Sequence, residues 1–194
     1  MEVVKYKHLA NSGDLIASMP GMKHVYDKLG KKAVIMQRLN APATYYSGAT
    51  HPVVDENGTM VCMSNKQWEM IVPLLEAQEY VERCEIWEGQ EFDINLDKIR
   101  ETDAANIPYG PIEIWQFMTH PLLTCDISKS WIKVSELNLD HSKAKDKVII
   151  NITERYRNHL ITYYFLKKWE DRLIFAGTKK EHELFCLSRL RKTS

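Results

Sequence analysis

NSGDLIASMP, residues 11–20, is the stretch that decides the fold, and it follows a short apolar strand expected over residues 3–9. Its small polar residues predict a turn, and the apolar residues after them predict a helix. A strand, a turn with an acid and an apolar-periodic helix form the first unit of a nucleotide-handling α/β domain. The sequence therefore predicts an α/β fold, with Asp14 at the carboxyl end of the first strand.

The predicted helix continues to Gly30, a natural terminating residue. Pro20 interrupts it. A proline inside a helix costs roughly 3 kcal/mol, so we expect Pro20 to open the main helix or to kink a short first turn. Residues 33–37 are expected to form a buried strand, and strand, helix and strand of these lengths predict a parallel pair. The apolar positions of the helix recur at helical spacing and are Leu15, Met19, Met22, Val25 and Leu29.

The middle of the chain is predicted from its turn and cap residues. Asn57-Gly58 favours positive φ and predicts a hairpin over residues 51–63. Ser64 is expected to cap a helix over residues 65–78, although Pro73 is unfavourable there. Further elements are expected as short strands over residues 81–87 and 92–96, and as a loop with a short apolar helix over residues 107–120.

The C-terminal part begins with a polar, charge-mixed segment, residues 139–147, which predicts a linker. We expect a strand over 148–152, a helix over 159–169, a strand over 172–176 and a helix from residue 180. These elements predict a Rossmann-like N-terminal domain with a parallel sheet over residues 1–138, the linker, and the start of a second Rossmann-like domain over residues 148–194. Two strands leave a sheet edge without a partner, so we also expect self-association or a completing partner chain.

Composition excludes several classes of protein. The chain has 194 residues, 26 of them Lys or Arg and 26 Asp or Glu, and this formal net charge of zero argues against a nucleic-acid-binding protein. No apolar run approaches the roughly 20 residues that span a bilayer, and no secretory signal is visible, so we expect a cytoplasmic protein without an integral membrane segment. The four cysteines form no CxxC pair, and neither they nor the seven histidines have the spacing of a metal site.

Asp14 is the first candidate for chemistry. A carboxylate at the start of a helix faces the positive end of the helix dipole and can accept a proton from a bound hydroxyl. The alternative is that Asp14 only caps the helix. The residues before it, Asn11, Ser12 and Gly13, are expected to contact a substrate.

A second cluster follows the strand at 148–152. Arg155 and Arg157 stand at alternate positions before Asn158 and a helix N-terminus, which makes a plausible phosphate site; surface arginines or a salt bridge are the alternative. Gly177 and Thr178, after the next strand, are a weaker candidate of the same kind. The chain contains no GxGxxG, no Walker loop and no GxSxG motif, which argues against a dehydrogenase, an NTPase and an α/β-hydrolase.

The run GDLIASMPGM, residues 13–22, resembles the N-terminal motif of heptosyltransferase-like glycosyltransferases. That motif has Gly-Asp, two apolar residues, a short spacer, then proline and an apolar-periodic helix. Residues 148–151 (VIIN), 155–158 (RYRN) and 174–178 (IFAGT), with Glu181, are similar to the opening of the family's second domain. The order and the spacing agree over most of the chain.

The resemblance implies a GT-B architecture of two Rossmann-like domains, the first for the acceptor and the second for the nucleotide-sugar. It implies an inverting transfer to a glycan hydroxyl without metal or other cofactor, with Asp14 as the general base and with Arg155 and Arg157 near the donor diphosphate. The family's second domain continues through more βα units than this chain has. The alternative is therefore a non-catalytic binding or interaction module derived from the same fold.

Overall fold

The computed structural model describes residues 2–43, 53–101, 109–118, 120–134, 145–152 and 163–190, without the side chains of 116–118, 121 and 187–190. The chain divides into two units, which are described separately. Unit 1 comprises residues 1–46 and 52–135, and unit 2 comprises residues 47–51 and 136–194. Most of the predicted linker, residues 139–147, lies outside the described residues.

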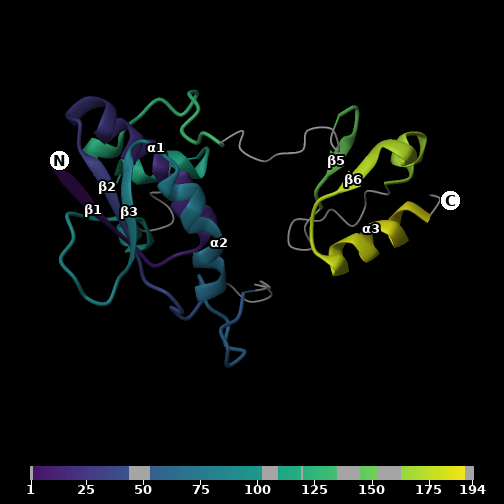
Figure 1. Cartoon of the computed structure of the whole chain (residues 1–194), viewed down its shortest axis with the longest axis horizontal. Helices are drawn as coiled ribbons and strands as arrows, with labels where there is room; N and C mark the ends of the chain where they lie inside the picture. Colours follow the sequence, from purple (N-terminus) through teal and green to yellow (C-terminus); the bar gives the residue numbers. More distant parts are fainter. Residues whose placement is uncertain are drawn as a thin grey trace. The chain divides into compact units, whose positions relative to one another are not determined.

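A four-stranded, all-parallel sheet forms the centre of unit 1, in the order β3–β2–β1–β4 (Figure 1). β1 pairs with β2 along its whole length, from Val3 opposite Lys32 to His8 opposite Gln37. The predicted α/β class and the predicted parallel pair are therefore confirmed. The strands are β1 (Val3–His8), β2 (Lys32–Gln37), β3 (Val81–Ile86) and β4 (Ile94–Asn95).

Helix α1 (Ser12–Leu29) connects β1 to β2 and ends at Gly30, whose φ of 66° is the left-handed conformation that glycine adopts readily. Pro20 does not open the helix, so that expectation is wrong: α1 begins at Ser12 and continues past the proline to Leu29. The alternative expectation, a kink near Pro20, stays a prediction. Pro20 removes the N–H that would reach the Ile16 carbonyl. The helix forms nevertheless, because turns on both sides of Pro20 bury apolar side chains, among them Leu15 and Val25.

Helix α2 (Asn65–Glu76) connects β2 to β3 and has the predicted cap at Ser64, whose hydroxyl accepts a hydrogen bond from the Gln67 amide at 3.4 Å. It ends two residues earlier than predicted. The hairpin predicted over residues 51–63 is present in reduced form. Residues 55–59 make the turn, Gly58 has a φ of 79°, and a single antiparallel bridge joins Val54 to Met60.

The core of unit 1 lies between the sheet and helices α1 and α2, which cover the same face (Figure 1). Tyr6 and Ile35 point into it from the central strands, and Leu123 closes it from η4. The helical segments that follow the sheet are short 3-10 helices: η1 (Leu96–Glu101), η3 (Ile112–Met118) and η4 (Pro121–Leu123). η3 corresponds to the apolar helix predicted within residues 107–120.

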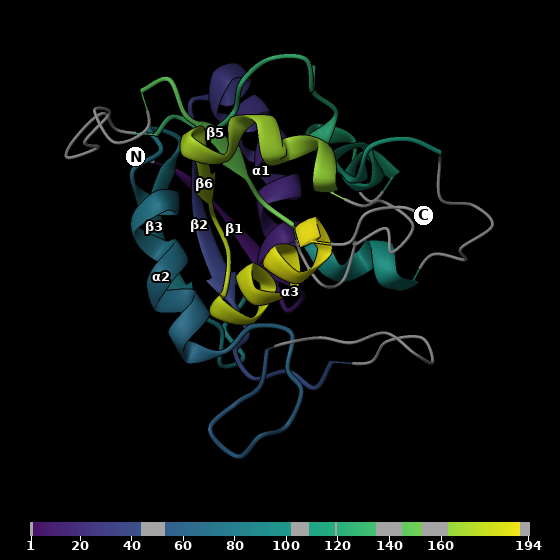
Figure 2. The same ribbon diagram turned by 90° about the vertical axis from the view of Figure 1, so that its right-hand side faces the viewer.

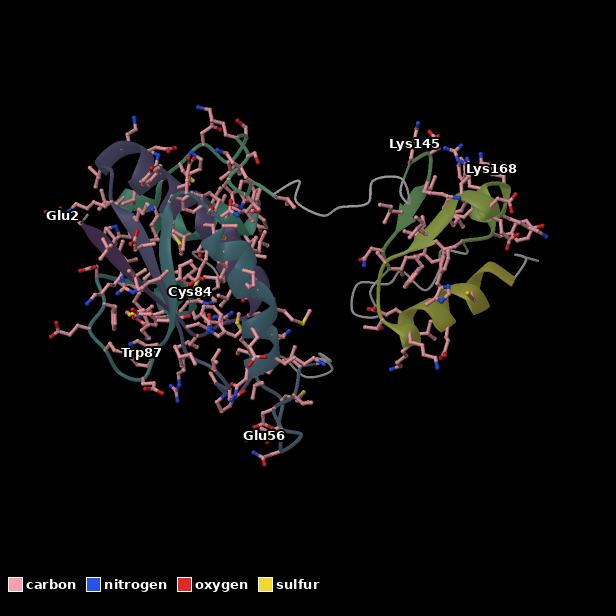
Figure 3. All side chains as sticks on the ribbon, in the orientation of Figure 1. Glu2, Glu56, Cys84, Trp87, Lys145 and Lys168 are labelled. Atoms are coloured by element: carbon pink, nitrogen blue, oxygen red, sulfur yellow. The ribbon has the colours of Figure 1, made fainter. Side chains whose placement is uncertain are left out.

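The opposite face of the sheet is crossed by the loop of residues 87–93, which carries the chain from β3 to β4 and bears Trp87 (Figure 3). The Lys7 ammonium lies under this loop, 5.0 Å from the centre of the Trp87 ring and 5.3 Å from that of Phe92. Asp93 fixes the far end of the loop, because its carboxylate accepts from the Lys5 amide at 2.8 Å and its amide donates to the Lys5 carbonyl at 2.9 Å. A loop thus covers this face where many α/β domains place a helix.

The last described segment of unit 1 is fixed near the start of β3. The Gln78 side chain donates to the Lys133 carbonyl at 3.0 Å and accepts from the Lys133 amide at 2.8 Å. The Tyr80 hydroxyl donates to the Trp131 carbonyl at 2.6 Å. Residues 131–133 are therefore part of the folded unit.

Unit 2 contains a parallel pair of strands, β5 (Val148–Ile150) and β6 (Leu173–Phe175), and helix α3 (Lys179–Leu190) (Figure 2). The Phe185 ring of α3 stacks on Phe175 at 5.4 Å. η6 (Tyr163–Arg172) precedes β6 and is interrupted at Trp169. Residues 159–162 lie outside the described residues, so the helix predicted over 159–169 is seen only from residue 163, where it is a 3-10 helix. Among the described residues, no helix combines the length and the apolar character that a membrane crossing requires.

Candidate functional site

The candidate site lies in unit 1, where the carboxyl ends of the strands meet the first turn of α1. In open parallel sheets this edge is where ligands bind. Asn11 precedes the helix in an extended conformation, and its amide donates to the Asp14 Oδ2 at 3.2 Å. Asp14 is therefore in the first turn, with its carboxylate folded back toward the start of the helix.

Arg100, from η1, also binds this carboxylate. Its Nη2 donates to the Asp14 Oδ2 at 2.8 Å, and the two side chains are 47% and 25% exposed. Both contacts of Asp14 use the same oxygen. Within the part of the chain that the structure describes, Asp14 Oδ1 has no hydrogen-bond partner and is the oxygen that could receive a ligand hydroxyl.

The turn between β1 and α1 is held by side chains from other strands. Asp97, the second residue of η1, accepts from the Leu9 amide at 3.0 Å. Gln37, the last residue of β2, donates to the Ala10 carbonyl at 3.3 Å and to the Arg38 carbonyl at 2.9 Å. The turn that carries Asp14 is thus fixed by its surroundings as well as by its own sequence.

His8, the last residue of β1, is buried beside Gln37, with 2.7 Å between its Nδ1 and the Gln37 Oε1. Because the Gln37 amide nitrogen already donates to two carbonyls, its oxygen faces the imidazole and Nδ1 carries the hydrogen. Burial lowers the pKa of His8, although Asp97, the Gln37 hydrogen bond and Asp14 act in the opposite direction. The imidazole is therefore neutral at pH 7.

Asp97 occupies a position between the turn and Lys7. Its Oδ2 accepts no hydrogen bond from any described group, and the Lys7 ammonium is 4.0 Å away. The carboxylate is nearly fully buried. A buried charge needs a partner, so Lys7 under the 87–93 loop provides the compensating charge at this edge.

His8 makes the stability of the fold depend on pH. Because its pKa is lowered from 6.5 in the folded chain, the unfolded chain binds the proton first as the pH falls. Stability conferred by the neutral imidazole is thus present above the unfolded pKa and is lost as the pH drops below it. We expect the unfolding free energy to fall by up to about 1.4 kcal/mol per pH unit below about pH 6.5.

Urea unfolding at several pH values would measure this slope. His8→Asn keeps a donor near the Nδ1 position and should flatten the slope. An unchanged slope in His8→Asn would assign the pH dependence to other groups.

The predicted site residues have different outcomes in the structure. Asn11, Ser12 and Gly13 lie in the turn and the first turn of α1, beside Asp14. Thr178 lies just before α3; its hydroxyl donates to the Glu181 carboxylate at 2.8 Å and accepts from the Glu181 amide at 3.3 Å, as a helix cap does. Gly177 packs closely, because a Cβ there would lie 2.7 Å from the Phe175 ring. Arg155, Arg157 and Asn158 lie outside the described residues.

Four residues at this edge were missed by sequence reasoning: His8, Gln37, Asp97 and Arg100. Three of them had a signal. His8 and Gln37 are polar residues that end strands, and Asp97 follows one within two residues, which places each at the edge where α/β sheets bind ligands. Arg100 had none, because its contact with Asp14 spans 86 residues.

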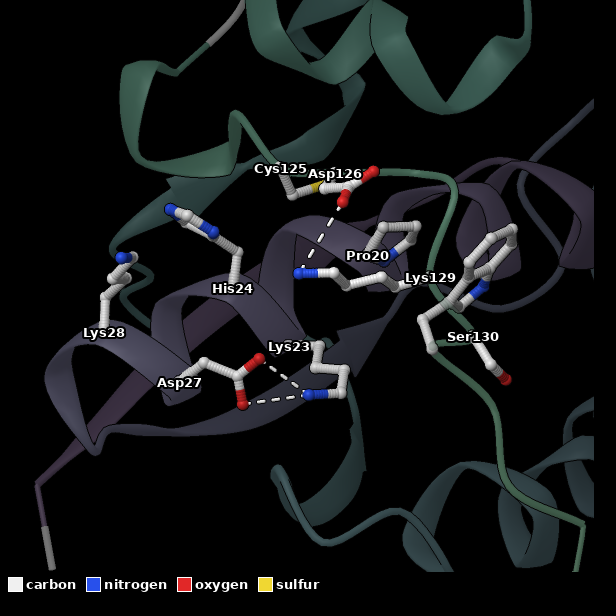
Figure 4. A pocket seen from close by; sticks show the side chains of 10 residues that line it. Pro20, Lys23, His24, Asp27, Lys28, Cys125, Asp126, Lys129 and Ser130 are labelled. Carbon is white, nitrogen blue, oxygen red and sulfur yellow. Dashed lines mark hydrogen bonds and ion pairs between the residues drawn. The ribbon is translucent and has the colours of Figure 1, made fainter.

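A separate surface pocket of about 430 Å³ lies between α1 and residues 125–131 (Figure 4). Lys23 points at Asp27 across its floor, with 2.6 Å between Nζ and Oδ2, and Lys129 lies 3.6 Å from Asp126. Four charged side chains of the lining thus form two ion pairs, and Lys28 is a further cationic residue of the lining.

Cys84 and Cys125 are poor candidates for a nucleophile. Burial raises the pKa of Cys84 to about 12 and that of Cys125 to about 11, so both thiols are protonated at neutral pH. Among the described residues, no group of three or more His, Cys, Asp or Glu side chains could hold a metal ion. Comparisons of the chain with protein-family models, with curated proteins and with solved structures find no match.

Proposed function

We propose that this chain is a glycosyltransferase of the heptosyltransferase-like, GT-B type, which transfers a sugar from a nucleotide-sugar to a glycan hydroxyl. The observation that carries the proposal is the placement of Asp14 at the carboxyl edge of a parallel sheet, partly exposed, with Oδ2 tied and Oδ1 free of described partners. The resemblance of residues 13–22 to the family motif supports it. Under this proposal the protein works in the cytoplasm.

In the proposed reaction, the acceptor hydroxyl donates a hydrogen bond to Asp14 Oδ1. As the acceptor oxygen forms its bond to the anomeric carbon, its proton passes to Asp14, and the bond from that carbon to the nucleoside diphosphate breaks on the opposite side. The configuration at the anomeric carbon is inverted. Arg100 and the Asn11 amide hold the carboxylate in one orientation, so little reorganisation is needed.

The donor diphosphate is proposed to bind residues of unit 2. Arg155, Arg157 and Asn158 are assigned this role by the resemblance, since guanidinium groups bind phosphate oxygens well. Thr178 and Gly177 are assigned to the same ligand, but Thr178 already makes its hydrogen bonds to Glu181, so we assign the main contribution to the two arginines.

A second candidate is a non-catalytic binding module of the same fold. It is favoured by a specific observation: the contacts of Asp14 with the Asn11 amide and Arg100 are also those of a purely structural helix cap. In that case the site would bind a ligand without catalysing a reaction, or Asp14 would have only a structural role.

The two candidates are separated by calorimetry and a transfer assay. We expect ADP, GDP or UDP to bind the full chain with a Kd in the submillimolar range. We expect the corresponding nucleotide-sugar to glycosylate a p-nitrophenyl glycoside, with the rate unchanged by EDTA. Binding without transfer would favour the module. If none of the three nucleotides binds at millimolar concentration, the transferase proposal is wrong.

A further inference from the structure

We infer that Gln37 is a positioning residue for Asp14, acting through the peptide group between Ala10 and Asn11. This peptide group is held at both ends. Its carbonyl accepts from Gln37 Nε2 at 3.3 Å, and its N–H donates to Asp14 Oδ2 at 3.2 Å. A peptide group is planar and rigid, so holding its oxygen also fixes the direction of its N–H. The inference rests on the proposed function in taking Asp14 as the base.

Only a primary amide can make the set of contacts that Gln37 makes. It needs one acceptor for the His8 N–H, at 2.7 Å, and two donors for the carbonyls of Ala10 and Arg38. A carboxylate of the same shape has no donors, and an apolar side chain has neither donor nor acceptor. The side chain is fully buried, so water cannot replace these contacts at low cost.

The peptide group between His8 and Leu9, two peptide groups earlier in the chain, is held in the same way. Its carbonyl accepts from the Arg38 amide at 2.8 Å, and its N–H donates to Asp97 Oδ1 at 3.0 Å. Two peptide groups, one on each side of the Leu9–Ala10 peptide, are thus fixed before the helix begins. With both fixed, the Asn11 amide meets Asp14 Oδ2, and Oδ1 takes part in neither of the two hydrogen bonds of this carboxylate.

Gln78 provides a matched control within the same unit. It is also buried, and its amide also donates to two carbonyls, those of Leu74 at 2.7 Å and Lys133 at 3.0 Å, and accepts from the Lys133 amide at 2.8 Å. Its contacts lie near the start of β3, away from Asp14. Replacing either glutamine removes the same kinds of hydrogen bond, but only one of the two replacements frees the Ala10–Asn11 peptide group.

The test compares Gln37→Met with Gln78→Met by residue-resolved amide hydrogen exchange on the full chain. The exchange rate of the Ile35 amide, in the centre of β2, reports the overall change in stability of each variant and is used to correct the Asn11 rate. In Gln37→Met we expect the corrected exchange rate of the Asn11 amide to rise at least about tenfold. In Gln78→Met the corrected rate at Asn11 should stay within about twofold of wild type. Gln37→Asn, which is one methylene shorter and keeps the amide, serves if the methionine variant does not fold.

Two results would overturn the inference. One is an Asn11 rate in Gln37→Met that rises no more than the Ile35 rate. The other is an equal corrected rise in both glutamine variants, which would show a general loss of stability.

With UDP-, GDP- and ADP-sugars as donors, Gln37→Met should lower kcat at least about tenfold and leave the donor KM nearly unchanged.

The inference and the proposed function fail in different ways. If Asn11 responds as expected but no nucleotide-sugar is turned over, the peptide clamp stands and the transferase proposal falls. If transfer depends on Asp14 and Gln37→Met changes neither kcat nor the Asn11 rate, only the inference about Gln37 falls.

Discussion

Asp14→Asn should lower the rate of sugar transfer by at least about 100-fold, since general-base catalysis contributes about 10²- to 10⁴-fold. The amide has the shape of the carboxylate, and its oxygen can still accept from the Asn11 amide and from Arg100. It cannot take a proton from the acceptor. Circular dichroism and nucleotide binding should be unchanged, so the loss should appear in kcat.

Asp27→Asn is the control for this substitution. Asp27 is also on α1 and is also ion-paired, with Lys23, but it lies nearly four turns further along the helix. Exposed ion pairs contribute only about 0–1 kcal/mol, so both variants should stay folded. Transfer by Asp14→Asn within about threefold of wild type would remove this residue from the mechanism and favour the binding module.

Gly21→Val should destabilise unit 1 by about 3 kcal/mol, as overpacking of a tight contact does. Gly21 is buried in the middle of α1, where η4 packs against the helix. A Cβ at this position would lie 2.9 Å from Leu123 Cδ2, 3.0 Å from its Cβ and 3.2 Å from its Cα. Because the backbone of η4 is part of the clash, a change of the Leu123 rotamer cannot remove it.

Gly13→Val is the matched control, because a Cβ at Gly13 meets nothing within 4 Å. It should change the unfolding free energy by less than about 1 kcal/mol, since valine is the better helix former of the two residues. Urea unfolding followed by far-UV circular dichroism measures both. Equal unfolding midpoints for the two variants would mean that α1 and η4 can separate without cost.

Periodicity was sufficient to predict the β1–α1–β2 unit. The apolar run over residues 33–36 and the helical spacing of Leu15, Met22 and Val25 are local signals, and the structure confirms the parallel pair that they predict. The cap at Ser64 was equally predictable, because a capping residue acts within one turn of its own position.

Pro20 shows where local reasoning fails. Its intrinsic cost predicted a helix boundary, but the apolar side chains of the turns on both sides outweigh that cost when they are buried together. The same limit applies to β4, predicted over residues 92–96 and found only at Ile94–Asn95, because its length depends on where the 87–93 loop allows it to meet β1.

The residues of the candidate site also differ in whether the sequence could predict them. Asp14 could be found from its place in a turn before an apolar helix. His8 and Gln37 look like the ordinary ends of two strands until the sheet places them side by side at 2.7 Å. Asp97 is marked only by its place two residues after a strand, and Arg100 has no signal, because its contact with Asp14 spans 86 residues.

The shortness of β4 has a consequence for how the candidate site would come apart on heating. This edge strand is joined to the sheet by two residue pairs, Tyr6–Ile94 and Lys7–Asn95, and it delivers both Asp97 and Arg100. Peripheral segments of this kind detach at a lower free energy than the interior of a domain. Mild heating would therefore release Asp97 and Arg100 from the candidate site while the hydrophobic core of unit 1 is still folded, and under the proposed function inactivation would precede melting.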